Sequence, residues 1–187
     1  MKDGIICIET EWEDTTKGNR RAVHTKALLD FLAKTEGCKV IYKTIATKAE
    51  LAFYLKRFNL KQYEDYSTFY LSFHGAPGAI QLEGERELLS LDALTESAAG
   101  AFEGRNVHFS SCRTLRGDEA ELLKFKEENG ILLLSGYTRK VDVADSAIHD
   151  LAYFDQLLRH PVRRAQTRDA MAKFFSELGK KLGFKIL

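Results

Sequence analysis

Two residues that could act as a nucleophile and a base each follow a short apolar run. His74 ends the run FYLSFH and precedes Gly75, and Cys112 ends the run VHFSSC, 38 positions after His74. A thiol attacks as its thiolate and needs a neighbouring base or cation, which an imidazole can supply. If the two runs are neighbouring parallel strands, both residues lie at the same edge of the sheet. The residue types and their positions therefore predict a Cys-His catalytic pair.

The backbone around this pair could stabilise a negatively charged oxygen. Gly75 has no side chain to keep another group away, and the N–H groups of Gly75 and Cys112 could both point toward a developing oxyanion. A helix predicted over 117–128 would begin shortly after Cys112, and the positive end of its dipole would favour both a thiolate and an oxyanion. We expect Gly75 and Cys112 to form an oxyanion hole.

Alternating strand-like and helix-like segments position these residues. Short apolar or β-branched runs predict strands over 4–8, 38–45, 68–73, 107–110 and 131–135. Apolar spacing, capping patterns and stop signals predict helices over 21–36, 48–58, 91–99, 117–128, 143–158 and 164–182. Two apolar pieces within 79–89 predict a small β-hairpin. The order of elements predicts a three-layer α/β fold, with a mostly parallel central sheet flanked by helices.

Composition favours one globular domain. The chain has 187 residues, 44% of them hydrophobic and 29% charged, and a net charge of +1 that gives no case for nucleic-acid binding. Its apolar runs are too short to span a membrane, and no secretory signal precedes them, so we expect a cytoplasmic protein. Cys7 and Cys38 lie inside strand-like runs and are interpreted as core residues. The segment from Arg159 onward is basic, and its helix 164–182 is expected to dock on the core formed by 4–158.

The runs FYLSFHG and VHFSSC resemble the caspase-like (clan CD) cysteine peptidases, which include caspases, gingipains, separases and CHAT-domain proteins. The segment 131–158 also looks like the end of a CHAT domain, which places bacterial CHAT-domain-like proteins nearest. The resemblance implies a caspase/hemoglobinase-like fold and hydrolysis of a peptide or protein substrate through an acyl-enzyme, with no cofactor and no metal. It assigns Cys112 as nucleophile and His74 as general base and then acid, and it leaves an unknown activating partner open.

The resemblance also suggests where substrate specificity arises. The side chain before the cleaved bond would lie between the end of the first strand and the loop after the fifth, which here means Glu9 and the segment 137–142. Within that segment, Tyr137 could form an aromatic wall and Asp142 could contact substrate. Caspases place an arginine after the first strand to bind aspartate, whereas this chain has Glu9, Glu11 and Asp14. We therefore predict cleavage after a basic residue.

Several alternatives remain open at this stage. Ser111 stands where bacterial caspase homologues often carry an aspartate, so the closeness to metacaspases is limited. An inactive caspase-like binding or regulatory module would have the same sheet and the same nearness of His74 to Cys112. The α/β pattern also fits a flavodoxin-like cofactor binder. His74 could be a core histidine, and a zinc site formed by His74, His108 and Cys112 lacks the usual short ligand spacing. Glu9, Asp142 and Asp145 could be ordinary solvated surface groups.

Overall fold

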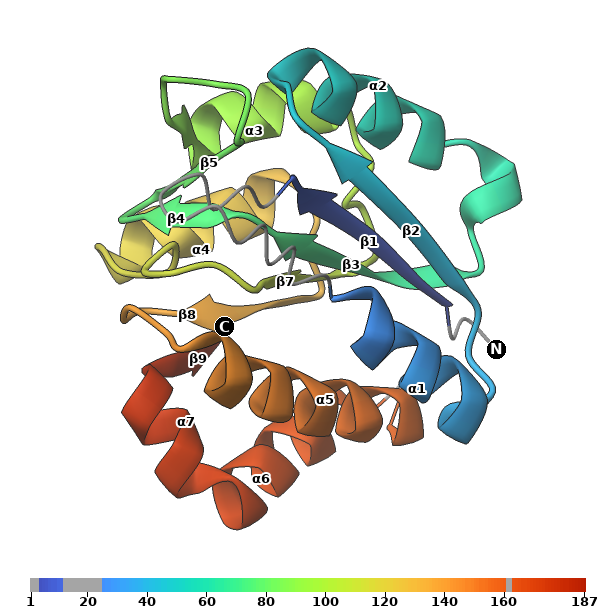
Figure 1. Cartoon of the computed structure of the whole chain (residues 1–187), viewed down its shortest axis with the longest axis vertical. Helices are drawn as coiled ribbons and strands as arrows, with labels where there is room; N and C mark the ends of the chain where they lie inside the picture. The colour runs from blue at the N-terminus through green and yellow to red at the C-terminus, as the bar shows by residue number, and fades with distance from the viewer. Residues whose placement is uncertain (1–3, 12–24, 161–162) are drawn as a thin grey trace, which may run out of the picture.

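A six-stranded sheet forms the centre of the computed structural model, which describes residues 4–11, 25–160 and 163–187 (Figure 1). The strand order is β2-β1-β3-β7-β8-β9, and all neighbours are parallel except β8 and β9. The strands are β1 (Gly4–Thr10), β2 (Val40–Ile45), β3 (Tyr66–Ser72), β7 (Asn106–Phe109), β8 (Leu133–Tyr137) and β9 (Phe184–Ile186). β1, β7 and β8 are buried along their whole length, as expected for central strands covered on both faces.

Helices cover both faces of this sheet and complete the predicted three layers (Figure 1). One face carries α1 (Lys26–Glu36), α5 (Val143–Arg159), α6 (Arg164–Phe174) and α7 (Ser176–Leu182). The other face carries α2 (Lys48–Phe58), α3 (Leu91–Ala98) and α4 (Glu119–Glu128), and a short 3-10 turn, η2 (Lys61–Tyr63), follows α2. Within the described residues, no helix has the length and apolar character needed to cross a membrane.

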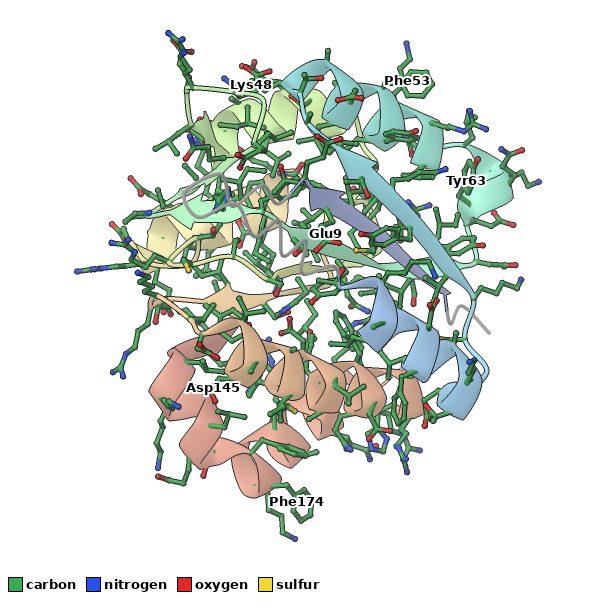
Figure 2. The ribbon with its side chains drawn as sticks, in the orientation of Figure 1. Glu9, Lys48, Phe53, Tyr63, Asp145 and Phe174 are labelled. Atoms are coloured by element: carbon green, nitrogen blue, oxygen red, sulfur yellow. The ribbon has the colours of Figure 1, made fainter. Side chains whose placement is uncertain are left out.

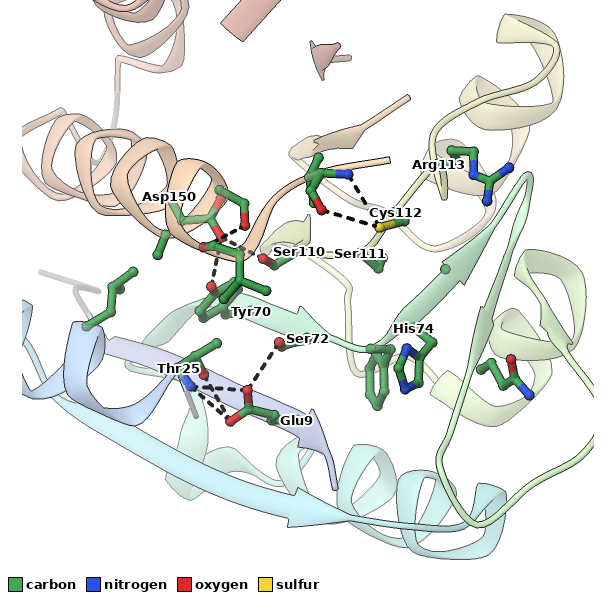
Figure 3. Close-up of a pocket in the computed structure, with 18 of the residues that line it drawn as sticks. Glu9, Thr25, Tyr70, Ser72, His74, Ser110, Ser111, Cys112, Arg113 and Asp150 are labelled. Atoms are coloured by element: carbon green, nitrogen blue, oxygen red, sulfur yellow. Dashed lines mark hydrogen bonds between the residues drawn. The ribbon is translucent and has the colours of Figure 1, made fainter. Parts of the chain in front are cut away.

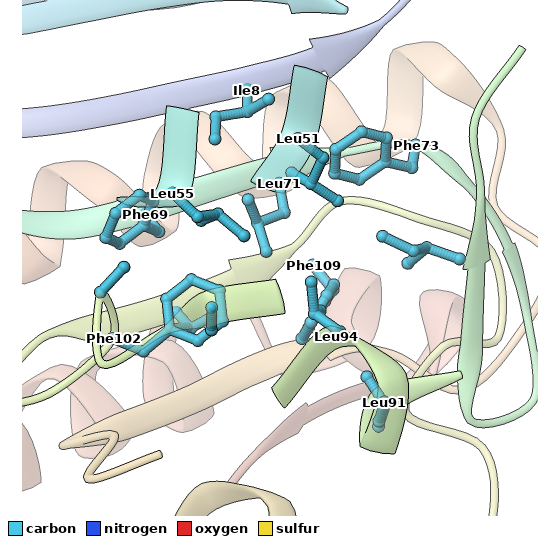
Figure 4. Close-up of a cluster of buried hydrophobic side chains, with 14 of the residues drawn as sticks. Ile8, Leu51, Leu55, Phe69, Leu71, Phe73, Leu91, Leu94, Phe102 and Phe109 are labelled. Carbon is cyan, nitrogen blue, oxygen red and sulfur yellow. The ribbon is translucent and has the colours of Figure 1, made fainter. Parts of the chain in front are cut away.

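The strands divide their side chains between two hydrophobic cores. Along β1, Ile6 and Ile8 pack into the core beneath α2, α3 and α4, whereas Ile5 and Cys7 pack into the core beneath α1 and α5. This alternation follows from the two-residue period of a strand. Figure 4 shows part of the first core, in which Ile8 lies near Leu51 of α2 and Leu71 of β3. Cys7 is fully buried and Cys38 is buried, as predicted for packing residues.

Local sequence signals explain several element ends. At the start of α2, the Thr47 side chain accepts from the Glu50 N–H, and the Glu50 carboxylate accepts from the Thr47 N–H. This capping box fixes the start of the helix, and both observed bounds match the predicted helix 48–58. Gly37 ends α1 in the left-handed conformation, with φ of 68°. Residues 21–24 of the first predicted helix lie outside the described residues.

The segment after β3 forms a small antiparallel sheet of its own. It contains β4 (His74–Ala76), β5 (Ala79–Gln81) and β6 (Leu89–Ser90), in the order β4-β5-β6. The predicted hairpin over 79–89 is present as β5 and β6, and the additional strand β4 precedes it. Pro77 and Gly78 make the tight turn between β4 and β5. His74 therefore begins β4, two residues beyond the end of β3, and does not itself end the long strand.

The last part of the chain differs from the single predicted helix over 164–182. Phe175 separates α6 from α7, and Gly183, with φ of 65°, ends α7 and turns the chain into β9. A side chain at Gly183 would lie 2.3 Å from Thr138 Oγ1, so this turn needs glycine for space as well as for conformation. β9 then pairs antiparallel with β8 at the edge of the sheet. No strand was predicted there.

Candidate functional site

A cavity of about 940 Å³ opens at the carboxyl ends of the central strands, where sites form in parallel α/β sheets. Its lining includes His74 from β4 and Cys112 from the segment after β7 (Figure 3). Gly75 of β4 also lines it. Glu9 from the end of β1 lines it as well. The structure thus brings together four of the residues singled out from the sequence.

Gly75 lies directly against the backbone of the cysteine. A Cβ atom at Gly75 would be 2.2 Å from the Cys112 carbonyl oxygen and 2.9 Å from the Cys112 nitrogen, so only glycine fits. Hydrogen bonds hold this approach in place, because Gly78 N–H donates to the Thr114 carbonyl and Thr114 Oγ1 donates to the Ala79 carbonyl, each at 3.2 Å. The β4–β5 turn and the cysteine segment are therefore joined side by side.

The N–H groups near this contact suit an oxyanion. Among the described residues, the Cys112 N–H donates to no protein acceptor. In β4, the two-residue turn makes Ala76 and Ala79 a hydrogen-bonded pair, so by the antiparallel alternation the Gly75 N–H points away from β5. Neither donor is used by the ladder of the small sheet.

The thiol of Cys112 is half-buried and contacts the loop before α5. The Val141 N–H donates to Cys112 Sγ at 3.4 Å, and the Val141 carbonyl lies 4.0 Å from the sulfur. α5 starts two residues later, so its N-terminus lies near the thiol. The helix expected after Cys112 is present as α4, which begins at Glu119, two residues later than predicted, because Asp118 caps it there.

The imidazole of His74 is held from a different side. Its side chain is 47% exposed, and Nε2 lies 3.1 Å from the carboxylate of Glu83, which belongs to the loop between β5 and β6. That loop is anchored, because the Glu83 N–H donates to Thr10 Oγ1 at 2.8 Å and the Gly84 N–H to the Ala46 carbonyl at 3.0 Å. Glu83 can therefore orient the ring. This role was not predicted, because the sequence marks Glu83 only by its position in a turn nine residues after His74.

Glu9 lies on the floor of the cavity and is fully buried (Figures 2 and 3). Its carboxylate accepts from the Thr25 N–H at 3.1 Å, from the Tyr42 hydroxyl and from Ser72 Oγ at 3.4 Å. The alternative that Glu9 is a solvated surface group is wrong, because the end of β1 is covered on both faces. Glu11 is exposed, and Asp14 lies outside the described residues.

A second buried carboxylate, Asp150 of α5, also lines the cavity and was not predicted. It accepts from Ser110 Oγ at 2.6 Å and the Tyr70 hydroxyl at 2.7 Å, and it pairs with His108 Nε2 at 2.9 Å. Burial alone would raise the pKa of Asp150, but the charge and hydrogen bond of His108, with hydroxyl donors, hold that pKa below its ordinary value. Asp150 is therefore ionised near neutral pH.

The network around Asp150 explains the mid-strand histidine. His108 Nδ1 lies 2.9 Å from Ser135 Oγ, so both ring nitrogens are engaged within the core. Burial, followed by the charge of Asp150, raises the pKa of Tyr70 well above its usual value, which keeps this hydroxyl a donor. His108 is therefore a structural residue of the core. Among the described residues, no group of His, Cys, Asp and Glu could hold a metal ion, so the zinc alternative with His74 and Cys112 is wrong.

Two of the expected substrate-binding residues lie away from the cavity lining. Tyr137 is fully buried at the end of β8, where its hydroxyl donates to Asp150, so it cannot form an aromatic wall. β8 runs two residues beyond the predicted strand and carries Tyr137 into the core. Asp142 is exposed and caps α5, accepting from the Ala144 N–H at 2.9 Å. From the segment 137–142, Lys140 and Val141 line the cavity instead.

The comparisons with known proteins agree with this architecture. The solved structure of caspase-1 from Spodoptera frugiperda matches with a TM-score of 0.56 and 13% sequence identity, covering 100% of this chain and 86% of the caspase chain. The fold is therefore caspase-like, as predicted. No curated protein matches the sequence. A family described as "Family of unknown function (DUF6642)" matches residues 2–187, and the chain belongs to that family.

Proposed function

We propose that the chain is a cysteine endopeptidase that hydrolyses peptide bonds through an acyl-enzyme on Cys112. The observation that carries this proposal is the fit of Gly75 against the Cys112 backbone, 2.2 Å from a hypothetical Cβ to the carbonyl oxygen. His74, Gly75 and Cys112 all line one cavity, which supports the proposal. We also propose that the chain is similar to bacterial CHAT-domain proteins and that it is located in the cytoplasm.

In the proposed reaction, His74 takes the proton of the thiol and the Cys112 thiolate attacks the carbonyl carbon of the substrate. The N–H groups of Gly75 and Cys112 stabilise the resulting oxyanion. His74 then protonates the leaving amine as the peptide bond breaks, which leaves a thioester. A water molecule, deprotonated by His74, attacks the thioester, releases the acid and restores the thiol.

This reaction requires Cys112 and His74 to approach one another. In the structure, the hydrogen-bond partners of the sulfur are the N–H and carbonyl of Val141. Rotation about the Cys112 side chain, when substrate enters, would move the sulfur from Val141 toward the imidazole. Hydrogen bonds of catalytic groups are often long before substrate binds and shorten in the complex.

The acidic floor of the cavity supports a basic residue before the cleaved bond. Glu9 and Asp150 are both buried there, and Asp150 is held ionised by its donors. A lysine or arginine side chain entering the cavity would meet negative charge, whereas an aspartate would be repelled. The proposed substrate is therefore a polypeptide with Arg or Lys at this position.

Active-site labelling tests the proposal. A peptidyl acyloxymethyl ketone with Arg should add one probe to the wild-type chain, detected by intact mass, and peptide mapping should place it on Cys112. Cys112→Ser and His74→Ala should abolish labelling, whereas Cys38→Ser should retain it, because Cys38 is buried away from the cavity. A matched Asp probe should react far more slowly.

The alternative outcome is equally clear. If iodoacetamide alkylates Cys112 while neither ketone reacts, the thiol is accessible but not activated, and the chain is an inactive caspase-like binding module. If the Arg and Asp ketones label Cys112 at equal rates, the peptidase assignment stands and the basic specificity is wrong.

A further inference from the structure

A second cavity, of about 580 Å³, adjoins the first on the side of Cys112. Four of its five lining residues are cationic, namely Arg113, Arg116, Arg139 and Lys140. Arg113 and Lys140 also line the main cavity, so the two spaces share a wall. We call these four residues the basic pocket.

The charges of the basic pocket are not neutralised within the described part of the chain. All four side chains are exposed, and none forms an ion pair with a described carboxylate. Arg139 Nη1 contacts a backbone oxygen, that of Lys181, at 3.5 Å. Like charges this close repel one another. An anion would relieve this repulsion.

The backbone holds the pocket in shape. Arg113 has a φ of 62°, a left-handed conformation that is unfavourable for a residue with a side chain. Its N–H donates to the Arg139 carbonyl at 3.0 Å, and its carbonyl accepts from the Arg116 N–H at 2.9 Å. The Leu115 N–H donates to the Tyr137 carbonyl at 3.1 Å. Two arginine-bearing segments are thus fixed beside each other, next to the proposed nucleophile.

We propose that the basic pocket binds carboxylate side chains of the polypeptide substrate, an inference that rests on the proposed function for the identity of its ligand. A peptide in the main cavity passes the shared wall of Arg113 and Lys140, so residues near the cleaved bond reach the pocket. Arginine guanidinium groups bind carboxylates in a bidentate manner. The favoured substrate then combines a basic side chain on the acidic floor with acidic side chains a few positions away.

Peptide binding to the full chain carrying Cys112→Ala tests this inference without catalysis. Fluorescein-labelled peptides would contain one arginine flanked, on its amino or its carboxyl side, by four aspartates or by four asparagines. Anisotropy should show one aspartate peptide binding at least about tenfold more tightly than its asparagine counterpart at low salt. Raising NaCl to about 0.3 M should shrink that difference through screening.

Charge variants locate the effect. R116E/R139E should remove the preference for the aspartate peptide and leave affinity for the asparagine peptide unchanged, because neither residue lines the main cavity. R116Q/R139Q should give a smaller loss. K56E/K61E changes two exposed lysines that line neither cavity and should change nothing. Unchanged thermal unfolding would confirm that the variants fold.

Three results would overturn the inference. Aspartate and asparagine peptides could bind equally, the preference could survive R116E/R139E, or tripolyphosphate could bind at the basic pocket while neither peptide does. The last result would indicate a site for a small free anion. The proposed function is tested by a separate experiment. If that function is wrong, the Arg ketone will not label the wild-type chain.

Discussion

The buried histidine of α5 makes a quantitative prediction about stability and pH. His149 is 1% exposed, its ring lies 4.3 Å from that of Phe184 between centroids, and Nδ1 lies 3.3 Å from the Tyr137 hydroxyl oxygen. Burial lowers the pKa of His149 to about 4, although the charge of Asp150 opposes this and His108 adds to it. His149 is therefore neutral in the folded chain near neutral pH.

The free energy of unfolding depends on pH because the pKa of His149 differs between the folded and the unfolded chain. In the unfolded chain the ordinary pKa is 6.5, so between pH 6.5 and 4 the unfolded chain binds a proton that the folded chain does not. Stability that is present above pH 6.5 is lost as the pH falls through this window. A difference of about 2.5 pKa units gives a loss of about 3 kcal/mol by pH 4. That is a large part of the ~5–15 kcal/mol typical of domains.

Urea unfolding from pH 7 to pH 4, compared between wild type and variants, measures this loss. His149→Gln removes the titrating ring, so its stability should fall less steeply than that of wild type, even though its stability at pH 7 is lower. His160→Gln is the matched control at the end of the same helix and should retain the wild-type slope. Parallel pH profiles for wild type and His149→Gln would refute the reasoning.

Three further changes probe the site. Gly75→Ala forces a methyl group against the Cys112 backbone. We expect the free energy of unfolding to fall by about 1–3 kcal/mol and ketone labelling to become slower. Unchanged labelling would contradict the close contact. Glu83→Gln keeps an acceptor for His74 Nε2, whereas Glu83→Ala removes it. Peptide hydrolysis should therefore slow less in Glu83→Gln than in Glu83→Ala, which should lose on the order of tenfold in kcat. Equal rates for the two variants would show that Glu83 is not a positioning residue. Asp150→Asn strips a charge from the buried network and should cost about 3 kcal/mol in urea unfolding, whereas a change below about 1 kcal/mol would show that the network contributes little.

The strands of the central sheet could largely be predicted from the sequence, because a strand that is buried on both faces is a nearly all-apolar run. The run 4–8 is almost entirely apolar and lies in β1, and the run 68–73 lies largely in β3. His74 and Cys112 could be placed at one edge of the sheet for the same reason, since each follows such a run. The capping box at Thr47 likewise marked the start of α2.

Features that depend on distant contacts were not predictable in this way. The predicted strand 131–135 stops before Gly136, yet β8 continues through it to Tyr137. A Cβ atom at Gly136 would lie 2.8 Å from the Phe109 carbonyl oxygen, so glycine lets the strands pack closely there. Asp150 occupies an ordinary position of an amphipathic helix, and its partners come from β3, from β7 and the residue after it, and from β8. β9 is three residues long and exists as a strand because it pairs with β8.

The two halves of the proposed dyad are held by different parts of the molecule. Cys112 is fixed by Val141 at the head of α5, whereas His74 is fixed by Glu83, whose loop is anchored to Thr10 at the end of β1. The Gly75 contact ties their backbones together, while the side chains face separate partners. Any ligand that moves the β5–β6 loop or the head of α5 therefore changes the separation of thiol and imidazole. Filling the cavity should therefore change the reactivity of Cys112 more than it changes the solvent exposure of Cys112.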